Sequence, residues 1–353
     1  MPAPTAGTGR PRFAALRREG SFTAIWVVAA LLFAVSPLIA SGSLSQASLN
    51  AMLPFAGVLA IAAIGQTLVI QQGGLDLSVP GTFSLGVVLV VMVPGGDASK
   101  LWLGLLVVVA AGLAAGLANG LAVTRLGITP LVATLGMNGV LLGVQQQVTH
   151  GSINYTAPAN WADVVGQKLL GVTVIAWIAL VVTVLVAIAM RRTVWGREFE
   201  LVGAGPRAAR AAGLPVARHQ VAAYAIAGVC YATAGALVAG FLGRPQLDAG
   251  NEYLLPTIAV VVLGGTALGG GRGSVLGTLG GVVFLAQLDQ LLNVLGVTTA
   301  VQYVIQGAIV ALGMGLRSVP WHALRARRSR DPAGSAPGAP RPGPPLTTST
   351  SSP

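Results

Sequence analysis

The chain has 353 residues, of which 54% are hydrophobic and 9% are charged, and its mean hydropathy is +0.77. Soluble domains carry about 25% charged residues, so this composition excludes a soluble enzyme and predicts a protein that crosses the membrane many times. The net charge of +11 does not indicate a nucleic-acid partner, because the basic residues flank apolar runs instead of clustering on one folded face. The expected surroundings of the chain are therefore membrane lipid.

Ten apolar runs follow one another along the chain, and each is interpreted as a transmembrane helix. They lie near residues 22–40, 51–72, 79–93, 101–124, 129–148, 169–190, 219–242, 253–269, 273–294 and 298–316. The third and eighth runs are short and border glycine-rich breaks, so they are expected to be tilted, broken or re-entrant. The predicted fold is all-α and polytopic, with about ten transmembrane helices over residues 21–317. Residues 1–20 and 318–353 are expected to be disordered tails, basic at the N-terminus and rich in Pro, Ser and Thr at the C-terminus.

The distribution of basic residues predicts the orientation of these helices. In a ten-span arrangement, 18 of the 21 Lys and Arg residues fall on one side, and only Lys100, Lys168 and Arg244 fall on the other. Positively charged loops stay in the cytoplasm. We therefore expect a multi-pass protein of the bacterial plasma (inner) membrane with both termini in the cytoplasm.

Small residues at four-residue spacing predict how the helices pack. Gly112, Gly116 and Gly120 share one helix face, and Gly273, Gly277 and Gly281 share another. Such faces let helix backbones approach closely in lipid. We interpret these glycines as packing positions of a compact helical bundle.

Polar side chains inside the apolar runs must each find a partner or line a cavity. Five of them are candidates for a translocation path: Asn119, Thr134, Asn138, Gln145 and Asp289. Hydrogen bonding between helices is the competing interpretation for each, and hydration near the interface is a further one for Asp289. The residues alone do not separate these alternatives.

Two segments carry signals of special local structure. The stretch containing Gly73, Gly74, Asp76 and Ser78 separates two apolar runs, and it predicts either a broken helix that forms a gate or a plain capped turn. The second segment predicts a short helix in the longest loop on the basic side, with its start and stop set by Gly and Pro residues. Its residues are Pro206, Arg207, Ala208, Ala211, Ala212 and Gly213. With little apolar bulk for anchoring in a membrane, this helix is interpreted as a docking element for another protein.

No catalytic, cofactor or metal site is expected. Cys230 is the single cysteine, and His150, His219 and His322 lie far apart in the sequence. The glycine-rich run at residues 263–274 lacks the Gly-Lys-Ser/Thr triplet of a phosphate loop, and neither lysine precedes Ser or Thr. The chain is therefore not expected to be an enzyme or to hydrolyse ATP itself.

Taken in order, these segments resemble the permease subunits of ribose-type ABC importers, within the branched-chain amino acid and sugar permease superfamily. The resemblance covers roughly residues 50–316 and rests on an ordered set of motifs. These are Gly65-Gln66-Thr67, Gly73-Gly74-Leu75-Asp76-Leu77-Ser78, Asn119-Gly120, Thr129-Pro130-Leu131-Val132-Ala133-Thr134-Leu135-Gly136, Gly203 and Gly205 before Ala208, Ala211, Ala212 and Gly213, and Val261-Val262-Leu263-Gly264-Gly265-Thr266.

The resemblance implies an ATP-driven importer of a simple sugar or related small polar solute. It implies three kinds of partner: cytoplasmic ATP-binding subunits, an extracytoplasmic solute-binding protein and a second permease copy or homologous permease. Residues 207–213 would be the coupling helix that contacts the ATPase. The chain departs from the family pattern at Pro80 and Asp289, which weakens the assignment of a sugar. The alternative is a self-sufficient secondary transporter or channel in which Asp76 or Asp289 carries ion coupling.

Overall fold

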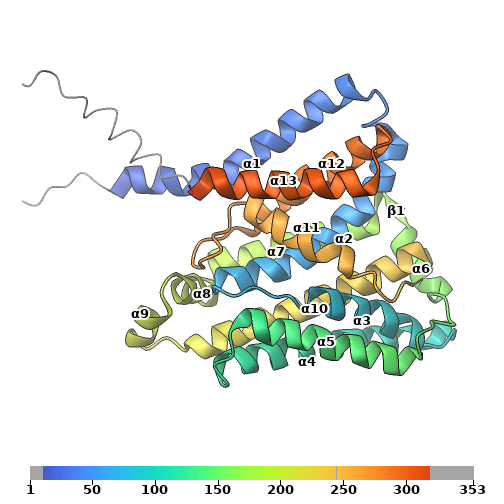
Figure 1. Ribbon diagram of the computed structural model, residues 1–353, viewed down its shortest axis with the longest axis horizontal. Coiled ribbons are helices and arrows are strands. Elements are labelled where there is room, and N and C mark those ends of the chain that lie inside the picture. Colours follow the sequence, from blue (N-terminus) through green and yellow to red (C-terminus); the bar gives the residue numbers. More distant parts are fainter. Residues whose placement is uncertain (1–10, 244, 319–353) are drawn as a thin grey trace, which may run out of the picture. The chain divides into compact units, whose positions relative to one another are not determined.

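The computed structural model describes residues 11–243 and 245–318. Residues up to Met314 form one unit, and the described part of the second unit, Gly315–Pro353, is the end of the last helix. Apart from one two-stranded hairpin, the described elements are helices (Figure 1). The α-helices are α1 (Pro11–Ile39), α2 (Gln46–Gln71), α3 (Val79–Met92), α4 (Leu101–Thr124), α5 (Pro130–Thr149), α6 (Ala159–Gly166), α7 (Val174–Arg192), α8 (Val194–Ala204), α9 (Pro206–Ala211), α10 (Val216–Leu242), α11 (Asn251–Leu263), α12 (Val275–Val294) and α13 (Thr299–Ser318).

Each of the ten predicted apolar runs is occupied by a helix, and the all-α prediction is confirmed. Within residues 11–243 and 245–318, six helices are long and apolar enough to cross a membrane: α1, α2, α4, α7, α10 and α12. At 1.5 Å per residue, α3 with 14 residues and α11 with 13 residues are each about 20 Å long, shorter than a hydrocarbon core of about 30 Å. The third and eighth runs are therefore short, as expected. The helix lengths do not confirm the predicted total of about ten crossings.

The predicted tails fall mostly outside the described residues, which exclude 1–10 and 319–353. Residues 11–20, which the sequence placed in the N-terminal tail, belong to α1. Pro11 starts this helix, and proline suits a first helical turn because no backbone donor is needed there.

The core of the first unit is formed by α2, α3 and α10, which are buried along most of their length. Helix α4 lies against α10 so closely that a Cβ atom on Gly116 would overlap the backbone carbonyl of Tyr224. A Cβ atom on Gly281 of α12 would likewise overlap the Val260 carbonyl of α11. The prediction that these glycines are packing positions on helices is confirmed for Gly112, Gly116, Gly120, Gly277 and Gly281, whereas Gly273 precedes α12 and lies against the Gln71 side chain.

The short elements gather at two ends of the bundle. Helices α8 and α9 lie at one end, and α6 and the hairpin lie at the other (Figure 1). In the hairpin, β1 (Lys168–Leu169) pairs antiparallel with β2 (Val172–Thr173). Trp161 of α6 ties its end of the bundle to α10 by donating a hydrogen bond of 2.8 Å to the Ala236 carbonyl. At the turn of 3-10 helix η1 (Ala98–Lys100), hydrogen bonds from Ser99 lower the pKa of the Asp97 carboxyl.

Candidate functional site

The helical structure is interrupted between α2 and α3, as the sequence predicted. Helix α2 ends at Gln71, and Gly73 then takes a left-handed conformation with φ of 76°, which glycine adopts without steric cost. Residues 74–78 lie outside any helix, and α3 starts at Val79 with its first hydrogen bond from the Thr82 N–H to the Ser78 carbonyl. Gly74 packs against the hydroxyl of Tyr224, so any side chain at this position would displace the tyrosine. The segment of residues 73–81 is called the break segment below.

Asp76 organises the middle of the break segment. Its Oδ1 atom accepts hydrogen bonds from the backbone N–H and the hydroxyl of Ser78, at 2.8 and 2.6 Å. Asn119 of α4 donates its side-chain N–H to the same Ser78 hydroxyl at 2.9 Å. Asp76, Ser78 and Asn119 are each 1% exposed, so this network is closed to solvent. Ser78 takes the cap position of α3, but its side chain does not bond to the helix.

Helix α5 holds the break segment from the other side. The Thr134 hydroxyl accepts a hydrogen bond of 2.9 Å from the Leu77 N–H. The side chain of Asn138 accepts one of 2.7 Å from the Gly81 N–H, and Gln145 donates one of 2.7 Å to the Gly81 carbonyl. Thr134 and Asn138 thus satisfy backbone N–H groups that an unbroken helix would have paired internally, and Gln145 adds a bond to a carbonyl inside α3.

Four of the five predicted path candidates therefore meet at the break segment: Asn119, Thr134, Asn138 and Gln145. The fifth, Asp289, lies in α12, and its Oδ1 atom accepts a hydrogen bond of 2.6 Å from Gln306 of α13. The hydrogen bonds explain all five as contacts between segments. Whether the same side chains also line a solute path stays a prediction.

Several buried polar atoms around the break segment have no hydrogen-bond partner among the described residues, and three of them lie at its middle. These three are Oδ2 of Asp76, Oδ1 of Asn119 and the hydroxyl of Tyr224. Buried polar atoms are rarely left unpaired, so this cluster is a place where small movements or a bound water would change the hydrogen bonding.

The short helix predicted from residues 206–213 is present as α9, Pro206–Ala211. It starts directly after Gly205, and the chain leaves it through Gly213 with φ of 81°. Only Ala209 is buried, against Val202 and Val216. The other predicted members are exposed: Pro206, Arg207, Ala208, Ala211, Ala212 and Gly213. The helix thus presents a small-residue surface bordered by arginine.

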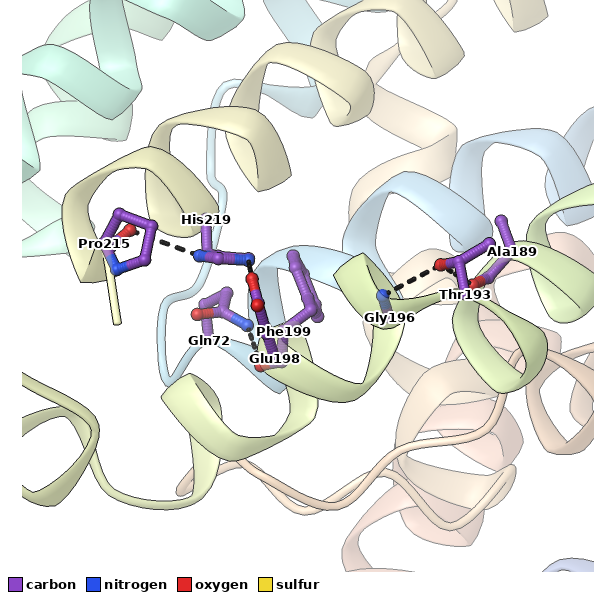
Figure 2. Close-up of polar contacts among 8 residues, drawn as sticks. All are labelled: Gln72, Ala189, Thr193, Gly196, Glu198, Phe199, Pro215 and His219. Atoms are coloured by element: carbon purple, nitrogen blue, oxygen red, sulfur yellow. Dashed lines mark hydrogen bonds and ion pairs between the residues drawn. The ribbon is translucent and has the colours of Figure 1, made fainter. Parts of the chain in front are cut away.

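A second helix in the same loop, α8, was missed by the sequence reasoning. Figure 2 shows Thr193 at the corner between α7 and α8, where its hydroxyl donates to the Ala189 carbonyl at 2.6 Å and accepts from the Gly196 N–H at 3.0 Å. The signal was available in the sequence: Trp195, Phe199 and Val202 follow this capping threonine at helical spacing.

Helix α8 contacts α10 and the end of α2. The Glu198 carboxylate lies 3.4 Å from Nε2 of His219, whose Nδ1 atom is 3.2 Å from the Pro215 carbonyl (Figure 2). Gln72, directly before the break segment, donates a hydrogen bond of 2.8 Å to the Phe199 carbonyl. These contacts connect the loop that carries α9 with the residue at which the break begins.

Comparison with known proteins identifies the family. Residues 48–313 match the model of the family described as "Branched-chain amino acid transport system / permease component". The chain belongs to this family.

Relatives of this permease include proteins named for two imported solutes. The chain is 34% identical to the autoinducer 2 import system permease protein LsrD of Yersinia enterocolitica over 75% of the chain and 81% of that relative. It is 31% identical to the ribose import permease protein RbsC of Bacillus subtilis over 85% of the chain and 92% of that relative. It is 32% identical to RbsC of Escherichia coli over 85% of the chain and 93% of that relative. No solved structure matches the chain significantly.

The family membership confirms that this chain is a permease of the ribose-type ABC class and a multi-pass membrane protein. Permease subunits of ABC importers are not themselves enzymes, in agreement with the sequence-based prediction. Within the described residues, no group of three or more His, Cys, Asp or Glu side chains has the arrangement of a metal site.

Proposed function

We propose that this permease moves a simple sugar or a related small polar solute into the cytoplasm, driven by ATP hydrolysis on partner subunits. The importers named for ribose and autoinducer 2 among its relatives support a small hydroxylated solute. The proposed assembly contains two cytoplasmic ATP-binding subunits, an extracytoplasmic solute-binding protein and a second permease copy or homologous permease. The proposed location is the bacterial inner membrane, with both termini in the cytoplasm.

The observation that carries this proposal is the exposed helix α9 in a loop rich in arginine. Its outer face consists of small residues, with Ala208, Ala211 and Ala212 exposed, while Ala209 fixes it to the bundle. A short helix of this kind fits a groove on another protein. The loop from Arg191 to Arg218 contains six arginines, which supports a cytoplasmic position. We assign α9 as the coupling helix that receives the ATPase.

The test is to purify the tagged permease from native membranes in mild detergent and to identify the proteins that accompany it. An ATP-binding subunit is expected with the unmodified chain and is expected to be lost with Ala211→Glu, since the new charge stands on the exposed face of α9. Ala159→Glu makes the same change at an exposed position at the other end of the bundle and should retain the ATPase.

Two results would contradict the proposal. Retention of the ATPase by Ala211→Glu would remove α9 as the docking helix. Purification of the unmodified chain without any ATPase, even after crosslinking, would contradict the importer assignment and direct attention to ion coupling by Asp76 or Asp289. Uptake of radiolabelled ribose and autoinducer 2 by cells that express the complete transporter then compares the two solutes.

A further inference from the structure

In the loop between α7 and α10, helix α8 contacts both α9 and the end of α2, directly before the break segment. On one side, Val202 of α8 packs with Ala209 of α9. On the other side, the Phe199 carbonyl accepts the hydrogen bond from Gln72. A displacement of α9 therefore reaches the break segment through α8 or through the backbone that leads into α10.

The contact between α8 and the end of α2 is too close to slide. A Cβ atom on Gly203 would overlap the Gln71 carbonyl, and that carbonyl accepts a hydrogen bond of 2.8 Å from the Gly271 N–H. The backbones of α8, α2 and the glycine-rich turn between α11 and α12 thus meet at one point. Interfaces packed to this density move as a body or separate, because they have no space in which to deform gradually.

The remaining contacts hold α8 in one orientation. Trp195 stacks on His219 with ring centroids 5.8 Å apart, and Phe199 lies 4.9 Å from Trp195. The side chain of His219 is 2% exposed, and both ring nitrogens face oxygen atoms, those of Glu198 and Pro215. This histidine therefore fixes the angle between α8 and α10, and Gln72 fixes the distance between α8 and the break segment.

We propose that α8 transmits the movement of α9 to the break segment, with Gln72 and Glu198 as positioning residues that keep α8 engaged. This inference rests on the proposed assignment of α9 as the coupling helix. It adds a defined mechanical connection: ATP-driven displacement of α9 carries α8, and α8 shifts Gln72 and thereby the residues that hold Asp76 and Ser78. Coupling of this kind requires a demonstrated response of the second site, not spatial proximity alone.

The experiment measures that response in the purified complex with its ATPase subunits. A reporter cysteine replaces the half-buried Leu75 in a Cys230→Ala background, and its rate of reaction with a maleimide is compared with and without ATP and vanadate. In the otherwise unmodified chain we expect ATP to change the rate by about five-fold or more, which is the lower end of typical allosteric coupling. With Gln72→Leu combined with Glu198→Ala, the ATP response should disappear while the ATPase remains bound and active.

Three variants separate this role from a loss of folding. Glu198→Gln keeps a polar side chain of the same size beside Nε2 of His219 and should restore most of the ATP response. Glu198→Ala alone, at a side chain that is 33% exposed, should reduce the response without unfolding the chain. Gln167→Leu repeats the glutamine substitution at an exposed position at the other end of the bundle and should leave the response unchanged.

Two outcomes would overturn the inference: an ATP response at position 75 that persists at full size in the Gln72 and Glu198 double variant, or no ATP response in the unmodified complex. The absence of a bound ATPase would instead contradict the proposed function, so the two failures are distinguishable.

Discussion

Asp76 is held through one carboxylate oxygen, which accepts both hydrogen bonds from Ser78, while its other oxygen has no partner among the described residues. We expect Asp76→Ala to lower the free energy of unfolding by about 1–3 kcal/mol, because the Ser78 groups stay buried and lose their acceptor. Asp76→Asn keeps an acceptor for Ser78 and should remain close to the unmodified chain. Thermal unfolding of the purified chain in detergent measures the difference.

The same two variants test whether transport requires the negative charge of Asp76. If transport by Asp76→Asn fails although the variant is as stable as the unmodified chain, the carboxylate has a role beyond holding Ser78. If Asp76→Ala is as stable as the unmodified chain, the hydrogen bonds from Ser78 to Asp76 do not contribute to the free energy of unfolding as described.

Gln145 and Gln147 provide a matched comparison two residues apart on α5. Gln145 is 3% exposed and donates to the Gly81 carbonyl, whereas Gln147 lies on the exposed face. Gln145→Leu should cost about 0.5–1.5 kcal/mol of stability, because the buried hydrogen bond to the Gly81 carbonyl is lost. Gln147→Leu should change stability by less than about 0.5 kcal/mol. Equal unfolding temperatures for the two variants would contradict this account of α5.

The sequence identified most of these side chains but not what they bind. Asn119, Thr134, Asn138 and Gln145 stood out because polar groups inside apolar runs need partners. Their common target is the break segment: Asn119 binds the Ser78 hydroxyl 41 residues away along the chain, and Gln145 binds the Gly81 carbonyl 64 residues away. Contacts over such separations depend on how α4, α5 and α3 pack. Tyr224 was missed for the same reason, since a tyrosine in an apolar helix carries no sign that it faces a glycine of another segment.

At the scale of elements, the close contact between α4 and α10 gives a second matched comparison. Gly116→Ala places a methyl group against the Tyr224 carbonyl and should cost about 1–3 kcal/mol, the usual effect of overpacking. Gly136→Ala on α5 meets no atom within 4 Å and should be neutral or stabilising by up to about 1 kcal/mol, because alanine favours helix formation. Thermal stability in detergent distinguishes them, and an opposite order would mean that α4 and α10 do not approach as described.

Helix positions were the part of the fold that the sequence determined best, because a run of about 20 apolar residues has one stable backbone state in lipid. Helix α5 begins at Pro130, one residue from the predicted start of the fifth apolar run. Helix α8 was missed because it is short, half exposed and charged, so its pattern lies inside what resembled a plain loop. Its importance comes from tertiary contacts with Gln72 and His219, which no local pattern encodes.

For the whole molecule, the arrangement of short elements and charge makes the orientation in the membrane testable. The α8–α9 end carries Arg197, Arg207 and Arg210, whereas the other end carries Lys100 and Lys168. Cytoplasmic surfaces are enriched in Lys and Arg, so the first end is expected to face the cytoplasm. Cys230 is buried in α10 and 8% exposed, which leaves a low background for introduced cysteines.

Two variants, each with one introduced cysteine, then report the sides directly. In intact cells, a membrane-impermeant maleimide should label Gln167→Cys, which is exposed beside the hairpin, and should not label Ala212→Cys until the membrane is permeabilised. Both positions are on the surface, so a difference in labelling reflects the side of the membrane and not burial. Labelling of both variants in intact cells would place the two ends on the same side of the membrane. That result would contradict a bundle whose helices span the membrane from one end to the other. Labelling of Ala212→Cys alone would invert the orientation, and α9 could not then contact a cytoplasmic ATPase.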